Sequence, residues 1–489
     1  MSNRDVERDR AGPMSETAEQ TAPGPAPGRD HSFFGHPKGL PYLLAADCGW
    51  AFAFFGIQVS LTLYMTQVLL KPGHVEKVLG FGPYRAFLAH TFGAVSDTAV
   101  ASQTFGIATG LVYALPILGG FIADRWIGQR RACASGLIVM VLACILMVRE
   151  ETFLFAIGFL VIGTGLMKAT LVGQIGRLYA PDDDRRTRGF GLYLIALNTG
   201  SFITPLICGT LGERLGWPFG FMAMGVGMGL GAVYYMLGFR HMPADVVQRA
   251  PARLKDEARV AAPKLHAAGL RMVAILLVLI AVDGLWAGIY NQAFNILPIW
   301  ADTHVERHIM GFLTPVTWIN TLDGVLTIIG TAFAVRLWAR QATKGGDGID
   351  IRRITIGLIL AGLAYLVLAG GAVIGGAGKA PLWPIVIFFL LIDFSIPWVD
   401  TVILTMISRD APASLTSTML GIYYLATAGG NFLNGWLGGF FDRMSPTAFW
   451  LIHAGLFGIL LLLFLLGGST LRRLLAANHE ETEIVAAPA

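Results

Sequence analysis

The stretch GGFIADRWIGQRR, residues 119–131, decides the fold of this chain. An apolar run ends in it at Asp124, and Arg125, Arg130 and Arg131 follow before the next apolar run begins. The two glycines at its start allow a close approach of helices, because glycine has no side chain. Connections rich in Lys and Arg stay on the cytoplasmic side of a membrane. The stretch therefore predicts two membrane-spanning helices joined by a tight cytoplasmic turn.

The rest of the chain has the composition of a membrane protein. Hydrophobic residues make up 54% of its 489 residues and charged residues only 14%. A helix needs roughly 20 apolar residues to cross the hydrocarbon core, and continuous apolar runs argue against the alternating segments of an outer-membrane barrel. About twelve runs qualify, near 40–70, 98–122, 132–149, 152–178, 188–210, 217–239, 271–299, 310–338, 354–376, 382–407, 414–440 and 446–468.

A polar stretch with three prolines, residues 241–270, divides these spans into two sets of six. The first 35 residues are rich in Pro, Ala and Gly and lack an apolar core, which predicts a disordered tail. The predicted organisation is a cytoplasmic tail at 1–35, an N-terminal bundle at 36–240, a cytoplasmic linker at 241–270, a C-terminal bundle at 271–470 and a cytoplasmic tail at 471–489.

The placement of Lys and Arg predicts the orientation. They gather in the even-numbered connections, including residues 125–131, 185–188 and 336–353, whereas the odd-numbered connections hold isolated cases such as Arg214 and Arg307. By the positive-inside rule both termini and the linker are cytoplasmic. The net charge of +4 therefore reflects topology rather than nucleic-acid binding, and we expect a multi-pass protein of a bacterial inner membrane.

An enzyme is disfavoured. The sequence has no HExxH motif, P-loop or nucleophile elbow, and its four cysteines lack metal-ligand spacing. Glycines at 225, 227, 229 and 231 imitate a dinucleotide fingerprint, but they lie inside an apolar span, where small residues serve helix packing. We expect no metal and no catalytic residue.

Six ionisable residues lie inside predicted spans. A charge near the bilayer centre costs about 2.5–3.5 kcal/mol on insertion scales, so such residues usually face a bundle interior or a water-filled pathway. This pattern is typical of a transporter. We expect Asp283 to lie nearer an interface and Asp400 to sit deeper, and we rank both below the others as functional groups. The six residues are Asp47, Lys168, Asp283, Asp323, Asp393 and Asp400.

The stretch at 119–131 resembles the signature loop of the major facilitator superfamily. The resemblance implies that Asp124 and Arg125 act in gating, holding the cytoplasmic side closed through charge contacts. A basic loop that only sets topology would explain the arginines, but not Asp124 and the glycines together. The implied fold is all-α, with about twelve transmembrane helices in two six-helix bundles that rock around a central site.

Longer segments narrow the resemblance to proton-dependent oligopeptide transporters. Residues 179–214, from Tyr-Ala-Pro-Asp-Asp-Asp-Arg-Arg to Gly-Glu-Arg, are similar to the fifth-span signature of that family. The stretches at 36–40, 163–168 and 421–428 agree with it in order. The resemblance implies proton-driven uptake of di- and tripeptides, with the proton as coupling ion and no other cofactor.

The chain departs from that family at charged positions. Where a first-span Glu-x-x-Glu-Arg cluster is usual, it reads Asp47-Cys48-Gly49-Trp50-Ala51, and in the seventh span Asn291 replaces the glutamate expected to meet a peptide's amino group. An amide offers hydrogen bonds to an ammonium group but no compensating charge.

The resemblance assigns site residues position by position. We hypothesise that Lys168 has Asp47 or a substrate carboxylate as counter-ion, although it could instead snorkel to an interface. Asp323 and Asp393 are candidate replacement proton sites beside Asp47, with static hydrogen-bonded acids as the alternative. The implied substrate-binding residues are Tyr113, Lys168, Asn198, Asn291, Asn320, Tyr423 and Thr427, with Trp50 and Phe54 adding an apolar wall.

The leading functional hypothesis is a proton-coupled symporter of di- or tripeptides or peptide-like molecules, embedded in the lipid bilayer as a monomer. A second hypothesis keeps the architecture but takes a modified peptide or natural product without a free amine, in either direction. A third is a sensor that no longer transports.

Overall fold

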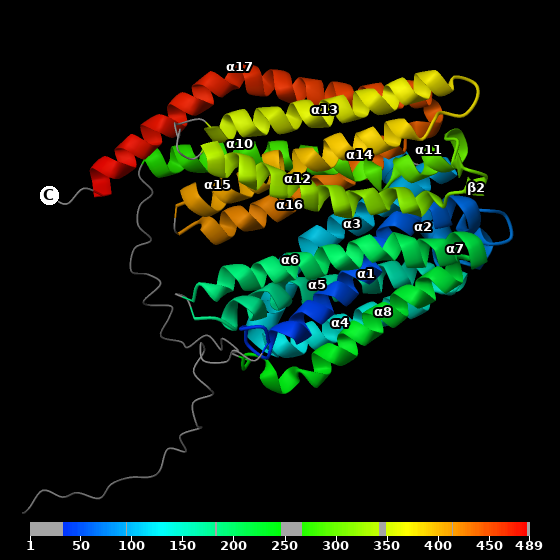
Figure 1. Cartoon of the computed structure of the whole chain (residues 1–489). Coiled ribbons are helices and arrows are strands. Elements are labelled where there is room, and N and C mark those ends of the chain that lie inside the picture. Colours follow the sequence, from blue (N-terminus) through cyan, green and yellow to red (C-terminus); the bar gives the residue numbers. More distant parts are fainter. Residues whose placement is uncertain are drawn as a thin grey trace, which may run out of the picture.

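The computed structural model describes residues 33–93, 95–180, 183–245, 267–341, 349–412 and 414–486. Most of the predicted N-terminal tail, most of the 241–270 linker and the last three residues of the predicted C-terminal tail lie outside these ranges. The described chain forms two bundles of long helices, one above the other in Figure 1.

The N-terminal bundle holds the first six spans, and apolar length sets each of them. The first and second are α1 and α3, each extended by a π-helical turn, and the fifth is α6 and α7, joined by a third such turn. The bounds are α1 Leu40–Tyr64, α2 Phe81–Phe92, α3 Asp97–Ile122, α4 Gln129–Met147, α5 Phe153–Arg177, α6 Arg185–Thr204, α7 Thr210–Leu215 and α8 Trp217–Leu237.

The C-terminal bundle repeats this plan. The seventh span is α10 and α11 with a short 3₁₀ turn at Asn291–Ala293 between them, and the tenth is α14 and α15 with a π-helical turn at Pro397–Thr401. The bounds are α10 Ala267–Tyr290, α11 Ile296–His304, α12 Thr321–Gln341, α13 Ile349–Gly375, α14 Trp383–Ile396, α15 Val402–Asp410, α16 Thr416–Gly438 and α17 Pro446–Ala486, with a hairpin of β1 His308–Ile309 and β2 Phe312–Leu313.

The predicted all-α membrane fold is confirmed. Within the described ranges, 11 helical stretches are long and apolar enough to cross a membrane. The remaining predicted span is α16, a helix of 23 residues with more polar side chains, which packs between α3 and α10. The last helix, α17, continues past residue 470, where we expected the C-terminal bundle to end.

The two bundles meet along α3 with α16 and along α6 with α12. Glycines make the first contact very close: a Cβ atom on Gly106 would lie 2.7 Å from the Cα atom of Gly435. Such an approach of two backbones is possible only without side chains. The distance between the two bundles is therefore small where α3 packs against α16.

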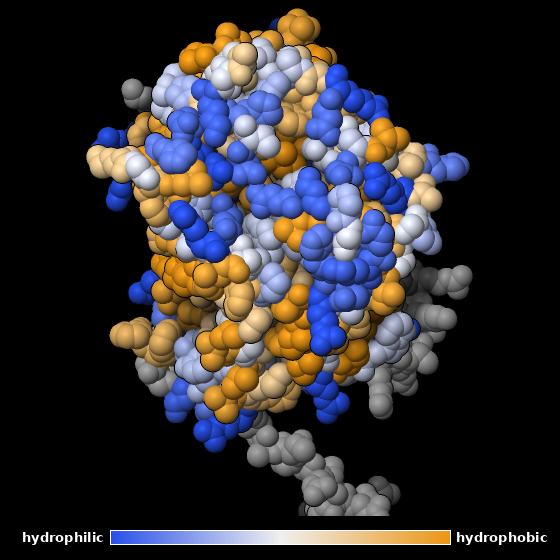
Figure 2. Space-filling model, turned by 90° about the vertical axis from the view of Figure 1, so that its right-hand side faces the viewer, coloured by the Kyte–Doolittle hydropathy of each residue, from blue (hydrophilic) through white to orange (hydrophobic). Residues whose placement is uncertain are grey.

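The spans end on two opposite faces. The basic face carries the even-numbered connections and the described ends of the chain, at the left of Figure 1. The opposite side carries α2, α11 and the β1–β2 hairpin, and we call it the hairpin face. Figure 2 looks onto the hairpin face, where hydrophilic residues run across the centre between apolar flanks.

Candidate functional site

An ion pair is buried in the N-terminal bundle. The Nζ atom of Lys168 on α5 lies 2.8 Å from Oδ1 of Asp47 on α1, and the Asp47 side chain is completely buried. The second oxygen of Asp47 has no hydrogen-bond partner among the described residues. Lys168 therefore points into the bundle, which contradicts snorkelling and agrees with the expectation that Asp47 is its counter-ion.

Aromatic rings surround this lysine. Its Nζ atom lies 3.8 Å from the centre of the Trp50 ring and 5.2 Å from that of Tyr193, which are cation–π distances. Trp50 stacks on Phe54 with ring centres 4.9 Å apart, and its indole N–H donates to Thr164 at 3.3 Å. Trp50 and Phe54 thus support Lys168 as a packed aromatic wall.

Two acidic groups face each other in the C-terminal bundle. The Tyr290 hydroxyl donates to Oδ1 of Asp323, and the carboxyl group of Asp393 on α14 interacts with that of Asp323 on α12. Asp393 is completely buried, and no described residue donates a hydrogen bond to either of its oxygens. A pair of this kind offers a place where one proton is shared between two carboxyl groups.

A second acidic pair lies nearby. The Tyr423 hydroxyl on α16 donates to Oδ1 of Asp400, and the carboxyl group of Asp283 on α10 interacts with that of Asp400. Asp283 is 1% exposed, and no described residue donates to its oxygens. The side chain of Asp283 is therefore turned into the bundle by the rotation of α10. The expectation that it lies nearer a membrane interface stays a prediction.

A cavity of about 150 Å³ lies between the bundles. Four predicted substrate-binding residues contribute to its wall: Tyr113, Asn291, Tyr423 and Thr427. Asp400, which we ranked low, also lines the cavity. The other lining residues are Trp286, Ala287, Tyr290, Ile396 and Tyr424.

Five predicted substrate-binding residues do not line this cavity. Lys168, Trp50 and Phe54 pack together in the N-terminal bundle, and the other two are Asn198 and Asn320. The Asn198 amide donates to the Leu194 carbonyl of its own helix at 2.8 Å. The Asn320 amide is buried and donates to the Ala293 carbonyl at 2.9 Å. In this conformation both amide groups are engaged with backbone carbonyls rather than available to cargo.

Asn291 connects the two halves. Its Oδ1 accepts a hydrogen bond from Gln58 on α1 at 3.1 Å, and its amide nitrogen donates to the Ala287 carbonyl at 3.0 Å. Farther along the same spans, the Thr62 hydroxyl donates to the Asn295 carbonyl at 2.9 Å. The break in the seventh span thus leaves a backbone carbonyl available to accept a hydrogen bond from α1, and this bond helps to hold α1 against the seventh span.

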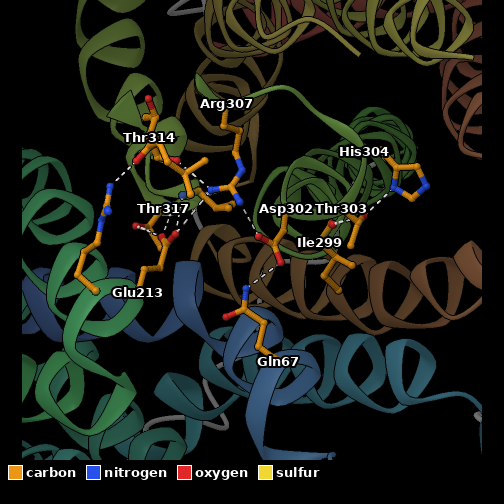
Figure 3. A network of polar contacts seen from close by, with 12 residues as sticks. Gln67, Glu213, Ile299, Asp302, Thr303, His304, Arg307, Thr314 and Thr317 are labelled. Carbon is orange, nitrogen blue, oxygen red and sulfur yellow. Dashed lines mark hydrogen bonds and ion pairs between the residues drawn. The ribbon is translucent and has the colours of Figure 1, made fainter. Parts of the chain in front are cut away.

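Figure 3 shows a polar network that closes the hairpin face. The Glu213 carboxylate at the end of α7 accepts hydrogen bonds from the backbone N–H groups of Val316 and Thr317, at 2.8 and 2.9 Å. It also accepts one from the Thr317 hydroxyl at 2.7 Å and lies 4.0 Å from Arg307. Arg307 pairs with Asp302 at 2.8 Å, and Gln67 donates to the same Asp302 at 2.8 Å.

Hydrogen bonds and ion pairs that join the two halves cluster in the part of the molecule nearer the hairpin face. The conformation is therefore one in which the cavity is sealed from that side.

Replacing Glu213 with glutamine is expected to loosen this seal, because an amide accepts the backbone N–H groups less strongly than a carboxylate and does not attract Arg307. We expect the population open at the hairpin face to rise about tenfold. Spin labels at Lys71 and Met310, one in each half, would report it as a longer-distance population. Glu306→Gln on the same face, at a carboxylate bonded to His308 alone, is the matched control. Unchanged distances in Glu213→Gln would contradict the sealing role.

The predicted gating residues lie on the opposite side. Asp124 and Arg125 are exposed at the basic face; Asp124 accepts a hydrogen bond from Gln129 at 2.9 Å. Within the described ranges, no ion pair involves either residue. Their gating role stays a prediction about the conformation in which the basic face closes.

Two segments that carried the resemblance meet at the basic face. His36 Nδ1 lies 2.8 Å from the Tyr179 hydroxyl, and Arg185 donates to the Gly35 carbonyl at 2.9 Å. Burial and the nearby Arg185 guanidinium lower the pKa of His36 below its usual range, so its ring is neutral at pH 7. These contacts fasten the start of α1 to the α5–α6 connection.

Comparison with known proteins agrees with this architecture. The family model of the Major Facilitator Superfamily matches residues 78–435. The peptide transporter YePEPT of Yersinia enterocolitica is 27% identical, over 86% of this chain and 91% of its own length. The uncharacterized transporter YclF of Bacillus subtilis is 26% identical over 88% and 94%, and a di-/tripeptide transporter of Lactococcus lactis subsp. cremoris is 23% identical over 89% and 96%.

Solved structures share the fold. A crystal structure of the peptide transporter POT in complex with sulfate has a TM-score of 0.79 at 23% identity and covers 91% of this chain and 96% of that one. A POT family transporter in complex with 5-aminolevulinic acid has a TM-score of 0.77 at 19% identity, with coverage of 90% and 98%. The relatives and the fold are those of transporters rather than enzymes.

Proposed function

This chain belongs to the major facilitator superfamily, and we propose that it is a proton-coupled symporter of di- and tripeptides or peptide-like molecules that works by alternating access. The observation that carries the proposal is the placement of charge: Lys168 is buried in one half, and Asp400 in the other half lines a cavity between the bundles. Relatives named as peptide transporters, which this chain matches over most of its length, support the peptide cargo.

The difference between the hairpin face and the basic face supports alternating access. In the conformation described here the hairpin face is sealed by the Glu213–Arg307–Asp302 network, and further hydrogen bonds between the halves cluster on the same side of the molecule. Because Lys and Arg gather at the basic face, we assign that face and both termini to the cytoplasm of a bacterial inner membrane. The conformation is then inward-facing, and we propose that the protein works as a monomer.

The proton supplies the driving force, and no other cofactor is needed. Moving one charge through 100 mV releases about 2.3 kcal/mol, which supports a concentration ratio of roughly fortyfold. We propose Asp323 and Asp393 as the groups that carry this proton, with Asp47 and Lys168 as the pair that responds to the substrate's carboxylate.

The test is uptake into liposomes that contain the purified protein, with an acidic exterior. Two cargoes, dialanine and N-acetyl-dialanine, are offered separately, and liposomes without peptide are the blank. We expect dialanine to accumulate with the pH gradient and to stop when a protonophore removes that gradient.

Other outcomes would overturn the proposal in defined ways. Uptake of N-acetyl-dialanine alone would indicate a transporter of modified peptides or natural products without a free amine. No uptake of either cargo, together with a raised melting temperature in the presence of dialanine, would indicate a sensor, because a ligand that binds only the folded form stabilises it.

A further inference from the structure

We propose that the Tyr290 hydroxyl passes protons between the central cavity and the buried acids Asp323 and Asp393. The inference rests on the proposed proton-coupled transport and deepens it, because it names the residue through which the coupling proton reaches its site. A carboxyl group that binds and releases a proton in every cycle needs a hydrogen-bonded partner that connects it to water.

The two acids are not part of the cavity wall. Asp393 is completely buried and Asp323 is 9% exposed, and neither lines the cavity of about 150 Å³. No described residue donates a hydrogen bond to either oxygen of Asp393. Asp400 differs from them, because it lines the cavity and can exchange a proton with it directly. The Asp323–Asp393 pair therefore requires an intermediary.

Tyr290 makes this connection. It lines the cavity, and its hydroxyl donates to Oδ1 of Asp323. Among the described residues, no other side chain of the cavity wall is hydrogen-bonded to Asp323 or Asp393. The carboxyl groups of the two acids interact with each other, so a proton delivered to the first can be shared with the second.

The hydroxyl can transfer a proton without forming a tyrosinate, because it is a donor and an acceptor at once. Its own proton moves along the hydrogen bond to Asp323, while its oxygen accepts a proton from a hydronium ion in the cavity. One O–H bond breaks and one forms at the tyrosine oxygen, and a water molecule remains in the cavity. Rotation of the new O–H bond toward Asp323 resets the relay, and release of the proton follows the same path in reverse.

Packing holds the phenol ring in place. Trp286 stacks on Tyr290 with ring centres 5.3 Å apart, and the Trp286 indole N–H donates to Ser395 on α14 at 3.3 Å. Phe294, from beyond the break in the seventh span, packs edge-on at 6.0 Å. Stacked and edge-on rings restrict the orientation of the phenol, and with it the direction of the hydroxyl. The ionisable groups that face the ring are Asp323 on α12, Asp393 on α14 and Tyr113 on α3.

The position of Tyr290 in the chain also suits a relay. It is the last residue of α10, directly before the 3₁₀ turn at Asn291–Ala293 that breaks the seventh span. A movement at this break would shift the hydroxyl relative to Asp323 on α12. The proton path can thus open and close together with the conformational change.

The experiment removes the hydroxyl and keeps the ring. In Tyr290→Phe we expect the initial rate of pH-driven dialanine uptake into proteoliposomes to fall about tenfold. Positioned side chains speed proton transfer by about 10²–10⁴-fold, and conformational steps share control of the overall rate. The final accumulation should equal that of the parent, because both acids remain, and counterflow should keep its rate. Tyr234→Phe, the same change at an exposed tyrosine of α8, is the matched control.

A second variant distinguishes a relay from a structural role. Adding Asp323→Glu to Tyr290→Phe lengthens the acid by one methylene group, so that its carboxyl group can reach the cavity through the space left by the hydroxyl. The initial rate of pH-driven uptake should then recover. A ring that only supports the fold would not be rescued in this way.

Each other outcome has a defined meaning. Parent-like initial rates in Tyr290→Phe would overturn the relay and leave proton-coupled transport standing. Loss of counterflow in Tyr290→Phe, or a double variant that stays slow with normal counterflow, would assign Tyr290 a structural role and overturn the relay as well. A parent protein whose dialanine uptake does not respond to the pH gradient would overturn the proposed function, and this inference with it.

Discussion

Lys168→Ala is expected to reduce peptide uptake by more than about a hundredfold. The substitution removes the partner of the substrate's carboxylate and leaves Asp47 completely buried without its counter-ion. Breaking a buried ion pair by removing one partner costs about 3–5 kcal/mol. Initial rates of pH-driven dialanine uptake into proteoliposomes, normalised to folded protein, would measure the loss.

A double variant separates function from folding in this case. Adding Asp47→Asn to Lys168→Ala removes the uncompensated charge, so the melting temperature should recover while uptake stays low. Lys71→Ala, at an exposed lysine in the same half, should behave like the parent. Transport that persists unchanged in Lys168→Ala would rule out its role in the site.

Asp393→Asn is expected to uncouple transport from the proton. The amide fills the same volume beside Asp323 but cannot release a proton. Accumulation of dialanine should fall from as much as roughly fortyfold at 100 mV to about equal concentrations on both sides, since no driving force remains. Counterflow, which needs only the exchange of cargo, should continue. Uptake at a series of external pH values, with and without a gradient, measures both.

Asp323→Asn should give the same phenotype, because the two carboxyl groups share one site. Asp442→Asn, at an exposed aspartate outside the cavity, serves as the control for both variants. If both variants kept the parent's dependence on pH, Asp323 and Asp393 would be static structural acids, and the proton would have to be carried elsewhere.

The spans could be predicted from the sequence because length and hydropathy suffice to define them. The run expected at 217–239 is α8 Trp217–Leu237, and the run expected at 152–178 is α5 Phe153–Arg177. The amphipathic α2 helix at Phe81–Phe92 was not predicted, since it is short and its apolar residues are interrupted. The break of the seventh span at Asn291–Ala293 likewise leaves no trace in hydropathy.

The orientation of side chains within the spans was harder to predict. Asp283 and Asp400 both lie in apolar runs, and only the rotation of α10 and the π-helical turn after Pro397 bring their carboxyl groups together. Asn198 was matched by position to a pocket residue, yet its amide bonds its own helix. The pairing of Lys168 with Asp47 was predictable, because a buried lysine requires an anion and the family resemblance placed both residues.

The network at the hairpin face was missed for a different reason. Glu213 lies at the fifth connection, whereas Asp302 and Arg307 lie close together at the seventh, far away in the chain, and each looks like an isolated loop charge. The available signal was their presence in odd-numbered connections that are otherwise poor in Lys and Arg. A charged residue in a connection where the positive-inside rule does not require one indicates a specific partner for that residue.

The central claim is that cargo and proton pass together through the crevice between the two halves. The most direct measurement traps a pH-sensitive dye inside proteoliposomes that start without a pH gradient and then adds dialanine outside. The account predicts that the interior becomes acidic as dialanine enters, and that Asp393→Asn abolishes the acidification. Entry of dialanine into vesicles of the parent protein with no change in internal pH would contradict it.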